Sequence, residues 1–199
     1  MWTSFCLYIS KPAIMNKAIH LIGISGSLRK GSFNTMLLKA AAELLPDGVT
    51  IEFLSIADLP VYNGDMDIPA RAARPEAVKK FREALAKADG IIIASPEYNY
   101  SIPGGLKNAV DWASRGEDSP LLGKHVSLMG ATQGQWGTVR MQLAFLPVFT
   151  TLKMLHINKF EVFVSLAQKK FDTEGNLIDA DTKGILKKHL EFFQATIVQ

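Results

Sequence analysis

The sequence is poor in cysteine, in blocks of like charge and in long apolar runs. Its single cysteine, Cys6, excludes a disulfide within the chain and is typical of a reducing compartment, so we expect a cytoplasmic protein. No run of five like charges occurs among the 22 basic and 19 acidic residues, which argues against a nucleic-acid partner. No stretch approaches the roughly 18 apolar residues of a membrane span, so we expect no membrane partner.

Side chains arranged for metal binding or acid–base catalysis are also lacking. The four histidines, His20, His125, His156 and His189, show no metal-ligand spacing. No serine–histidine or carboxylate–histidine constellation can be assembled from the sequence. We therefore predict no metal site and name no catalytic side chain.

What the chain does have is an alternation of strand-like and helix-like segments. Its 199 residues, 48% of them hydrophobic, suit one α/β domain with a sizeable core. Strands are expected over residues 18–24, 49–54, 90–95, 125–130 and 157–164. Helices are expected over residues 33–45, 75–88, 104–114, 139–152 and 181–197.

Such an alternation predicts a parallel sheet with right-handed crossovers. Five strands of this length fit a flavodoxin-like three-layer sandwich with strand order 2-1-3-4-5, whose ligand crevice lies between the first and third strands. We expect this domain to span residues 18–199. Residues 1–17 are expected to be an unstructured extension.

The loop after the first strand has the composition of a phosphate-binding loop. A phosphate monoester is a compact dianion that needs several donors and positive charge. The loop offers two hydroxyls, an amide and a guanidinium, at Ser27, Ser32, Asn34 and Arg29. Backbone N–H groups near Gly26 and Gly31, and those at the start of the next helix, would face the same anion.

Two other phosphate-binding motifs do not fit this loop. Gly26 and Gly31 have the Walker spacing, but Ser32-Phe33 stands where Lys-Ser/Thr is required. The glycines also do not match G-x-G-x-x-G, which argues against a Rossmann dinucleotide site. A serine-capped helix start with a flexible loop is the alternative for this segment taken alone.

The loops after the third and fourth strands suit a flat ring with polar edges. Isoalloxazine needs backbone amides at its pyrimidine end, because burying those edges without partners is costly. Residues 97–100 supply consecutive N–H groups and two aromatic walls, at Tyr98 and Tyr100. The segment 130–137 is rich in glycine, and Thr132 is a candidate donor to the ring edge. Tyrosines that only cap the core are the alternative.

Residues 26–34 and 96–112 together resemble the NAD(P)H-dependent FMN reductases, particularly the branch that reduces quinones and chromate. The resemblance extends from about residue 18 to residue 195. It implies bound FMN, NADPH or NADH as co-substrate, and a cytoplasmic homodimer or homotetramer. It assigns the phosphate to Ser27, Leu28, Arg29, Lys30, Gly31, Ser32, Phe33 and Asn34. It assigns the ring to Glu97, Tyr98, Asn99, Tyr100 and Thr132. The chain departs from the family at residues 135–137, Gln-Trp-Gly, where a glycine pair is common.

The function expected from this resemblance is hydride transfer from NAD(P)H to bound FMN and on to small-molecule acceptors. Those acceptors are quinones, with chromate, nitro or azo compounds or free flavin as further candidates. A flavodoxin-type electron carrier without an NADPH site is the first alternative, although such carriers are typically acidic and this chain has a net charge of +3. A non-catalytic flavin-binding regulator is the second.

A neighbouring subunit is expected to complete the ring pocket. The candidate contacts are Trp112 with Arg115 and Trp136 with Arg140. Packing of these residues on their own sheet is an equal alternative.

Overall fold

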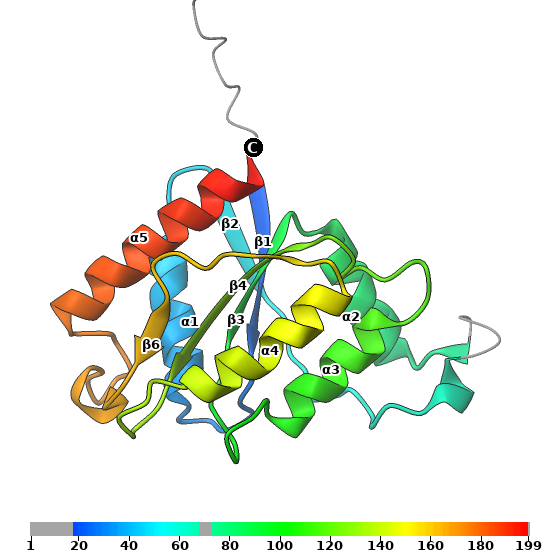
Figure 1. Cartoon of the computed structure of the whole chain (residues 1–199), viewed down its shortest axis with the longest axis horizontal. Coiled ribbons are helices and arrows are strands. Elements are labelled where there is room, and N and C mark those ends of the chain that lie inside the picture. Colours follow the sequence, from blue (N-terminus) through cyan, green and yellow to red (C-terminus); the bar gives the residue numbers. More distant parts are fainter. Residues whose placement is uncertain (1–17, 68–72, 199) are drawn as a thin grey trace, which may run out of the picture.

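The computed structural model describes residues 18–67 and 73–198, so the extension predicted over residues 1–17 lies outside the described residues. A central sheet is covered by helices on both faces, which gives the predicted three layers (Figure 1). The strands are β1 (Ile19–Ser25), β2 (Val49–Phe53), β3 (Gly90–Ala94), β4 (His125–Ala131), β5 (Leu155–His156) and β6 (Val162–Val164). The main helices are α1 (Phe33–Glu43), α2 (Glu76–Lys87), α3 (Gly104–Ser114), α4 (Val139–Thr151) and α5 (Ala180–Ile197).

The strand order is β2-β1-β3-β4-β5 and every pairing is parallel, which confirms the predicted topology. The strand predicted over residues 157–164 is wrong in its extent. The first residues of β4 pair with β5, and its last residues pair with β6, which follows after residues 157–161. The chain leaves the sheet between them, because Phe160 adopts a left-handed conformation with φ 57° that a strand does not accommodate.

The core lies on the two faces of the sheet. One face packs on α1 and α5, and the other packs on α2, α3 and α4. All five residues of β3 are buried, as the continuous apolar run predicts for a strand covered on both sides. Among the described residues, no helix combines the length and the apolar character needed to cross a bilayer.

A polar pair is buried within the α5 face of the core. His189 Nδ1 lies 2.9 Å from the Phe160 carbonyl oxygen, which can only accept, so this nitrogen carries the proton. Nε2 therefore accepts from the Ser127 hydroxyl, 2.5 Å away. Burial lowers the pKa of His189 from its ordinary 6.5 to about 4, so the ring is neutral at pH 7.

A buried arginine holds the carboxyl end of α3 in place. Arg82, from α2, donates from Nη1 to the carbonyls of Trp112 and Ala113, both at 2.8 Å. Its Nη2 donates to the carbonyls of Arg115 and Asp118 and forms an ion pair with the Asp118 carboxylate at 3.1 Å. The last carbonyls of a helix have no partner within that helix, and this guanidinium supplies partners to them.

Candidate functional site

The three loops singled out in the sequence meet at one edge of the sheet. Parallel pairing sets Ser25 of β1 beside Ala94 of β3, and Ala94 beside Met129 of β4. The strands therefore end together, and α1, α3 and α4 all begin at this edge (Figure 1). Carboxyl ends of parallel strands are where such sheets bind ligands.

The first loop presents backbone donors that the protein leaves open. Four N–H groups of this loop, those of Leu28, Lys30, Gly31 and Phe33, donate to no acceptor within the described residues. The side chains of Arg29 and Lys30 are exposed beside them. Open N–H groups at a helix start together with two cations are the donors and charges that a phosphate group requires.

The hydroxyls of the first loop also shape it. Ser32 is the N-cap of α1, and its Oγ accepts from the N–H groups of Asn34 (3.2 Å) and Thr35 (3.4 Å). Ser27 Oγ accepts from the Arg29 N–H at 3.4 Å. The serine-capped helix start, which is the alternative for this segment, is therefore present, and phosphate binding by the same loop stays a prediction.

The Asn34 side chain connects the first loop to β4. Its Nδ2 donates to the Ala131 carbonyl at 2.9 Å, and its Oδ1 accepts from the Ala131 N–H at 2.8 Å. Both amide atoms are thus engaged inside the protein, and Asn34 is buried. In this structure the side chain positions the first loop against the loop that contains Thr132.

The second loop is a tight turn with two exposed aromatic rings. Tyr98 and Ser101 exchange backbone hydrogen bonds, and the residues between them, Asn99 and Tyr100, have φ values of 49° and 62°. Two central residues with positive φ are the mark of a type I′ turn. The N–H groups of Glu97, Asn99 and Tyr100 donate to no acceptor in the described residues, whereas that of Tyr98 is engaged.

The Glu97 side chain makes contacts that the sequence did not reveal. Its Oε2 accepts from the backbone N–H groups of Arg140 (2.9 Å) and Met141 (3.2 Å), at the start of α4. Its Oε1 lies 3.4 Å from Arg140 Nη1. Glu97 therefore provides the cap that α4 lacks in its own sequence, since Thr138 makes no side-chain cap bond.

The third loop is folded tightly onto the sheet. The Thr132 N–H donates to the Val164 carbonyl at 2.9 Å, and its Oγ1 accepts from the Gly134 N–H at 3.3 Å. A side chain at Gly137 would come within 2.7 Å of the Phe163 backbone, so this position requires glycine. The Thr132 hydroxyl proton has no acceptor among the described residues, so the hydroxyl can donate to a ligand.

The two tryptophans that are candidates for subunit contacts differ in their exposure to solvent. Trp112 is fully buried within its own chain, where its Nε1 donates to the Pro60 carbonyl and its ring packs edge-on against Tyr62. Trp136 is 65% exposed. Within the described residues, no group of three or more histidine, cysteine or acidic side chains has the arrangement of a metal site.

The residues at this edge fit FMN. The first loop offers open N–H groups and two cations to a phosphate, and the second offers open N–H groups beside exposed rings to a flat heterocycle. The model for the family described as NADPH-dependent FMN reductase matches residues 19–169. The chain belongs to that family.

Similar proteins share nearly the whole length of this FMN reductase family member. An NAD(P)H-dependent FMN reductase from Pseudomonas aeruginosa is 41% identical over 180 residues, which cover 90% of this chain and 96% of that protein. A quinone reductase from Escherichia coli K12 is 38% identical, with 90% of this chain and 95% of that protein covered. The solved flavoenzyme NAD(P)H:(acceptor) oxidoreductase FerB from Paracoccus denitrificans has a TM-score of 0.81 at 28% identity, covering 90% of this chain and 97% of that one.

These findings confirm an oxidoreductase that uses FMN and NAD(P)H. The assignment of FMN to individual residues remains a prediction from the sequence.

Proposed function

We propose that this FMN reductase family member is an NAD(P)H:quinone reductase. The observation that carries the proposal is the convergence of open backbone donors, basic side chains and exposed aromatic rings on one edge of the sheet. Relatives from Escherichia coli and rice are described as a quinone reductase and a probable NADPH:quinone oxidoreductase. They support quinones as the acceptor class.

The first loop would hold the FMN phosphate, and the second and third would hold the ring. The phosphate would lie against residues 27–34, with the open N–H groups as donors and Arg29 and Lys30 as cations. The ring edge would meet the N–H groups of the 97–100 turn and the Thr132 hydroxyl. Asn34 would keep the two halves of the site at a fixed separation.

When bound, FMN supplies two-electron chemistry, so that NAD(P)H, a proton and a quinone become NAD(P)⁺ and a hydroquinone. The chain contributes by binding and orienting the reactants, which lowers the barrier through proximity. The Glu97 carboxylate at this edge is engaged with the start of α4. We therefore assign no general acid or base and expect water to supply the proton.

The test is an absorption spectrum of the purified protein before and after anaerobic NADPH. We expect a yellow protein whose flavin absorbance bleaches within seconds, and steady NADPH oxidation once a quinone is added. A flavodoxin-type carrier would keep its colour until a separate reductase is supplied. A regulator would show no steady turnover. A colourless protein that does not take up added FMN would refute the proposal.

The proposal extends to chromate, nitro compounds, azo compounds and free flavin as further acceptors, since flavin reductases with an open ring edge accept many oxidants. Each is tested by NADPH oxidation under anaerobic conditions. Because the donor is a pyridine nucleotide of the cell interior, we also propose that the enzyme works in the cytoplasm.

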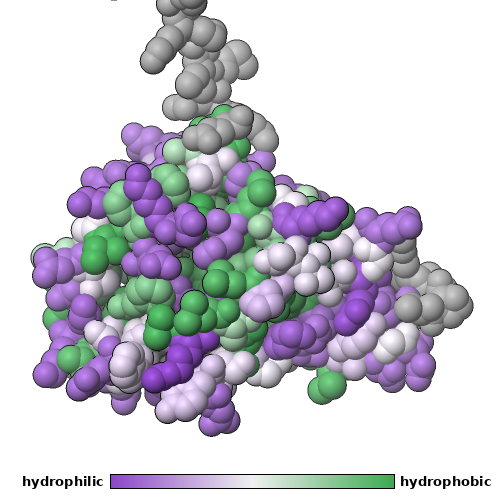
Figure 2. All heavy atoms as spheres, viewed as in Figure 1, coloured by the Kyte–Doolittle hydropathy of each residue, from purple (hydrophilic) through white to green (hydrophobic). Residues whose placement is uncertain are grey.

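A homodimer or homotetramer is part of the same proposal. Leu143 and Leu146, on the outward side of α4, are 58% and 42% exposed. Figure 2 shows hydrophobic side chains gathered on the face that carries this helix. A second copy would remove this surface from water. Sedimentation equilibrium that shows only a monomer would contradict it.

A further inference from the structure

The third loop is folded against residues 162–167, which include β6. Three backbone hydrogen bonds of 2.9 to 3.0 Å join the two segments, those from the Thr132 N–H to Val164, from the Ala167 N–H to Thr132 and from the Leu166 N–H to Gly134. The Thr132 hydroxyl, which is the proposed donor to the ring edge, lies between these bonds. Its position therefore depends on where residues 162–167 lie.

The place where β6 begins is set by the way the chain leaves the sheet after β5. β5 ends at His156 and β6 begins at Val162, and both strands pair with β4. Between them, Phe160 has a φ of 57°. That conformation costs free energy in a residue other than glycine, and it persists where neighbouring contacts determine it. A contact at Phe160 therefore fixes the residue at which the chain rejoins β4.

The His189 side chain, on α5, supplies that contact. Its Nδ1 donates to the Phe160 carbonyl at 2.9 Å, and its Nε2 accepts from the Ser127 hydroxyl at 2.5 Å. Ser127 belongs to β4, the strand that runs directly into the third loop. His189 is 1% exposed and Ser127 is fully buried, so water does not compete for either hydrogen bond. One imidazole thus connects α5, β4 and the segment that leads to β6.

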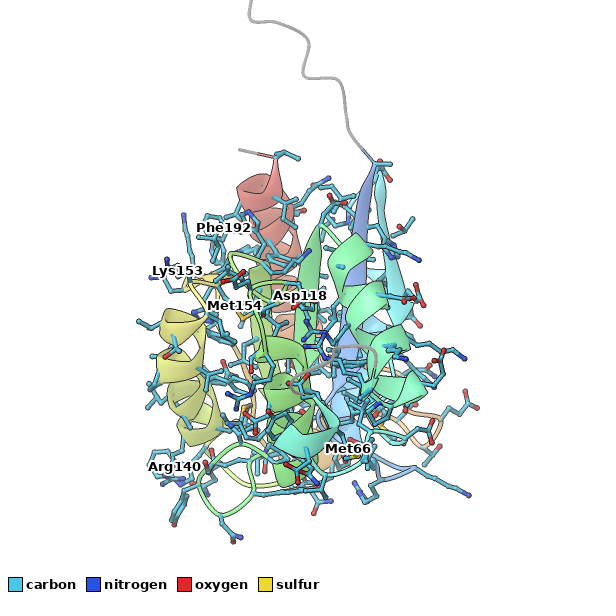
Figure 3. All side chains as sticks on the ribbon, turned by 90° about the vertical axis from the view of Figure 1, so that its right-hand side faces the viewer. Met66, Asp118, Arg140, Lys153, Met154 and Phe192 are labelled. Carbon is cyan, nitrogen blue, oxygen red and sulfur yellow. The ribbon has the colours of Figure 1, made fainter. Side chains whose placement is uncertain are left out.

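We propose that His189 is a positioning residue for the flavin ring. By binding the Phe160 carbonyl it keeps β6 in register with β4, and β6 keeps the Thr132 loop in the shape that the ring edge requires. His189 acts from a distance, because Figure 3 labels Phe192, three residues further along α5, and Arg140, at the start of α4, near opposite ends of the molecule. The inference rests on the proposed function, in particular on the contact between Thr132 and the ring.

A purely structural role for His189 is the competing explanation. The loss of a buried hydrogen-bonded side chain lowers the stability of the whole fold. Unfolding of the whole chain would weaken the phosphate loop and the ring loops by the same factor. A positioning role affects the ring alone, because the three hydrogen bonds to residues 162–167 come from the third loop. The two roles therefore differ in their effect on the two fragments of the cofactor.

The test measures the affinity of the flavin-free chain for lumiflavin, which is the bare ring, and for inorganic phosphate. His189→Leu removes both hydrogen bonds and should weaken lumiflavin binding about tenfold, while phosphate affinity changes less than about twofold. His189→Gln keeps a donor and an acceptor in the side chain. It should bind lumiflavin within about threefold of the wild type, so the conservative variant rescues most of the loss.

Leu186→Ala is the matched control. Leu186 is fully buried on the same helix, three residues before His189, so its truncation destabilises the same part of the core. It leaves both hydrogen bonds of His189 in place and should leave lumiflavin affinity unchanged. Denaturant unfolding of each variant verifies that the chain is folded under the conditions of the binding experiment.

Hydrogen exchange in the wild-type chain gives an independent measure. The Nδ1 proton of His189 is buried and hydrogen bonded, so the exchange of its NMR signal with water reports how often this contact opens. Lumiflavin at ten times its dissociation constant should slow this exchange about tenfold, because the open state does not hold the ring. Phosphate at the same relative concentration should leave the exchange rate unchanged.

The inference is overturned if His189→Leu keeps its lumiflavin affinity, if lumiflavin and phosphate weaken by the same factor, or if Leu186→Ala weakens lumiflavin as much. If His189→Leu does not fold, the exchange measurement decides. Equal slowing by the two ligands, or no slowing by lumiflavin, then overturns the inference. A wild-type chain that binds neither FMN nor lumiflavin refutes the proposed function instead.

Discussion

Arg82 and Arg140 both lie against the end of a helix, yet the protein uses their donors differently. Arg82 is buried at the carboxyl end of α3 and donates to four carbonyls. Arg140 is in the first turn of α4, is partly exposed and has one hydrogen-bonding side-chain partner among the described residues, Glu97. A polar group satisfied within the chain contributes to stability, whereas one with open donors is available to a ligand. The comparison therefore predicts that Arg82 serves stability, whereas Arg140 has donors open to a ligand.

The largest effect is expected from Arg82→Ala. The change leaves the last carbonyls of α3 without their buried partner and also removes the ion pair to the exposed Asp118 carboxylate, so the free energy of unfolding should fall by about 3 to 5 kcal/mol, mainly from the carbonyls. Denaturant unfolding of the FMN-free protein measures it. Arg82→Lys keeps the charge but cannot reach four carbonyls, so its loss should be intermediate. An unchanged denaturant midpoint for Arg82→Ala would show that Arg82 does not stabilise the fold.

His189 is a neutral polar side chain inside the core, and like Arg82 it has hydrogen-bond partners within the protein. Its folded pKa of about 4 lies below its ordinary value of 6.5, so the unfolded chain binds the proton more readily between these values. Stability is therefore full above about pH 6.5 and is lost as the pH falls toward 4, by about 3 kcal/mol.

His189→Gln removes this titration, because an amide can still donate and accept without changing charge. Unfolding of the wild type and of the variant should be compared from pH 4 to pH 7. The difference between them isolates His189 from His125 and His156, whose pKa values burial also lowers. Parallel pH profiles for the two proteins would contradict the assignment.

Arg29→Ala tests an arginine with open donors. We expect the affinity for FMN to fall about 10- to 100-fold, since one charge-assisted contact to the phosphate is lost. The unfolding free energy of the FMN-free protein should change by less than about 0.5 kcal/mol, because Arg29 is exposed. Lys188→Ala, an exposed cation on α5, is the control and should leave FMN affinity unchanged. Full flavin retention in Arg29→Ala would contradict the phosphate assignment.

The smallest effect is expected at Glu97, which is a stabilising cap and also holds Arg140. Glu97→Gln removes the negative charge from the start of α4, so the free energy of unfolding should fall by about 0.5 to 1 kcal/mol. Glu43→Gln removes an exposed charge at the opposite end of a helix, the last residue of α1, and should cause no loss. Equal losses in the two variants would show that the carboxylate of Glu97 does not cap α4.

Local patterns predicted the elements and the loops, and contacts distant in sequence were missed. The apolar run of β3 and the spacing of α3 are readable from the residues themselves, so their predicted positions agree with the structure. The segment 157–164 is apolar at its ends, but the turn at Phe160 depends on a carbonyl that binds His189, 29 residues away. No local signal marks that contact.

In the candidate site too, local features were predicted and contacts between distant residues were missed. The strand-to-helix loops were found because glycine, serine and basic residues occur together in sequence. The capping of α4 by Glu97 joins residues 43 positions apart, and the bond between Asn34 and Ala131 joins residues 97 positions apart. Composition predicted which loops come together at the candidate site. The contacts of Arg140 with the Tyr100 and Trp136 rings became visible only when the fold brought two loops together.

The double hydrogen bond between Asn34 and Ala131 has a thermodynamic consequence. Because it fixes the separation of the two halves before any ligand binds, phosphate and a bare ring would each meet a half that is already formed. Inorganic phosphate and lumiflavin, the bare ring, should therefore bind almost independently, with little change in each other's affinity. The intact cofactor would bind more tightly than its fragments separately.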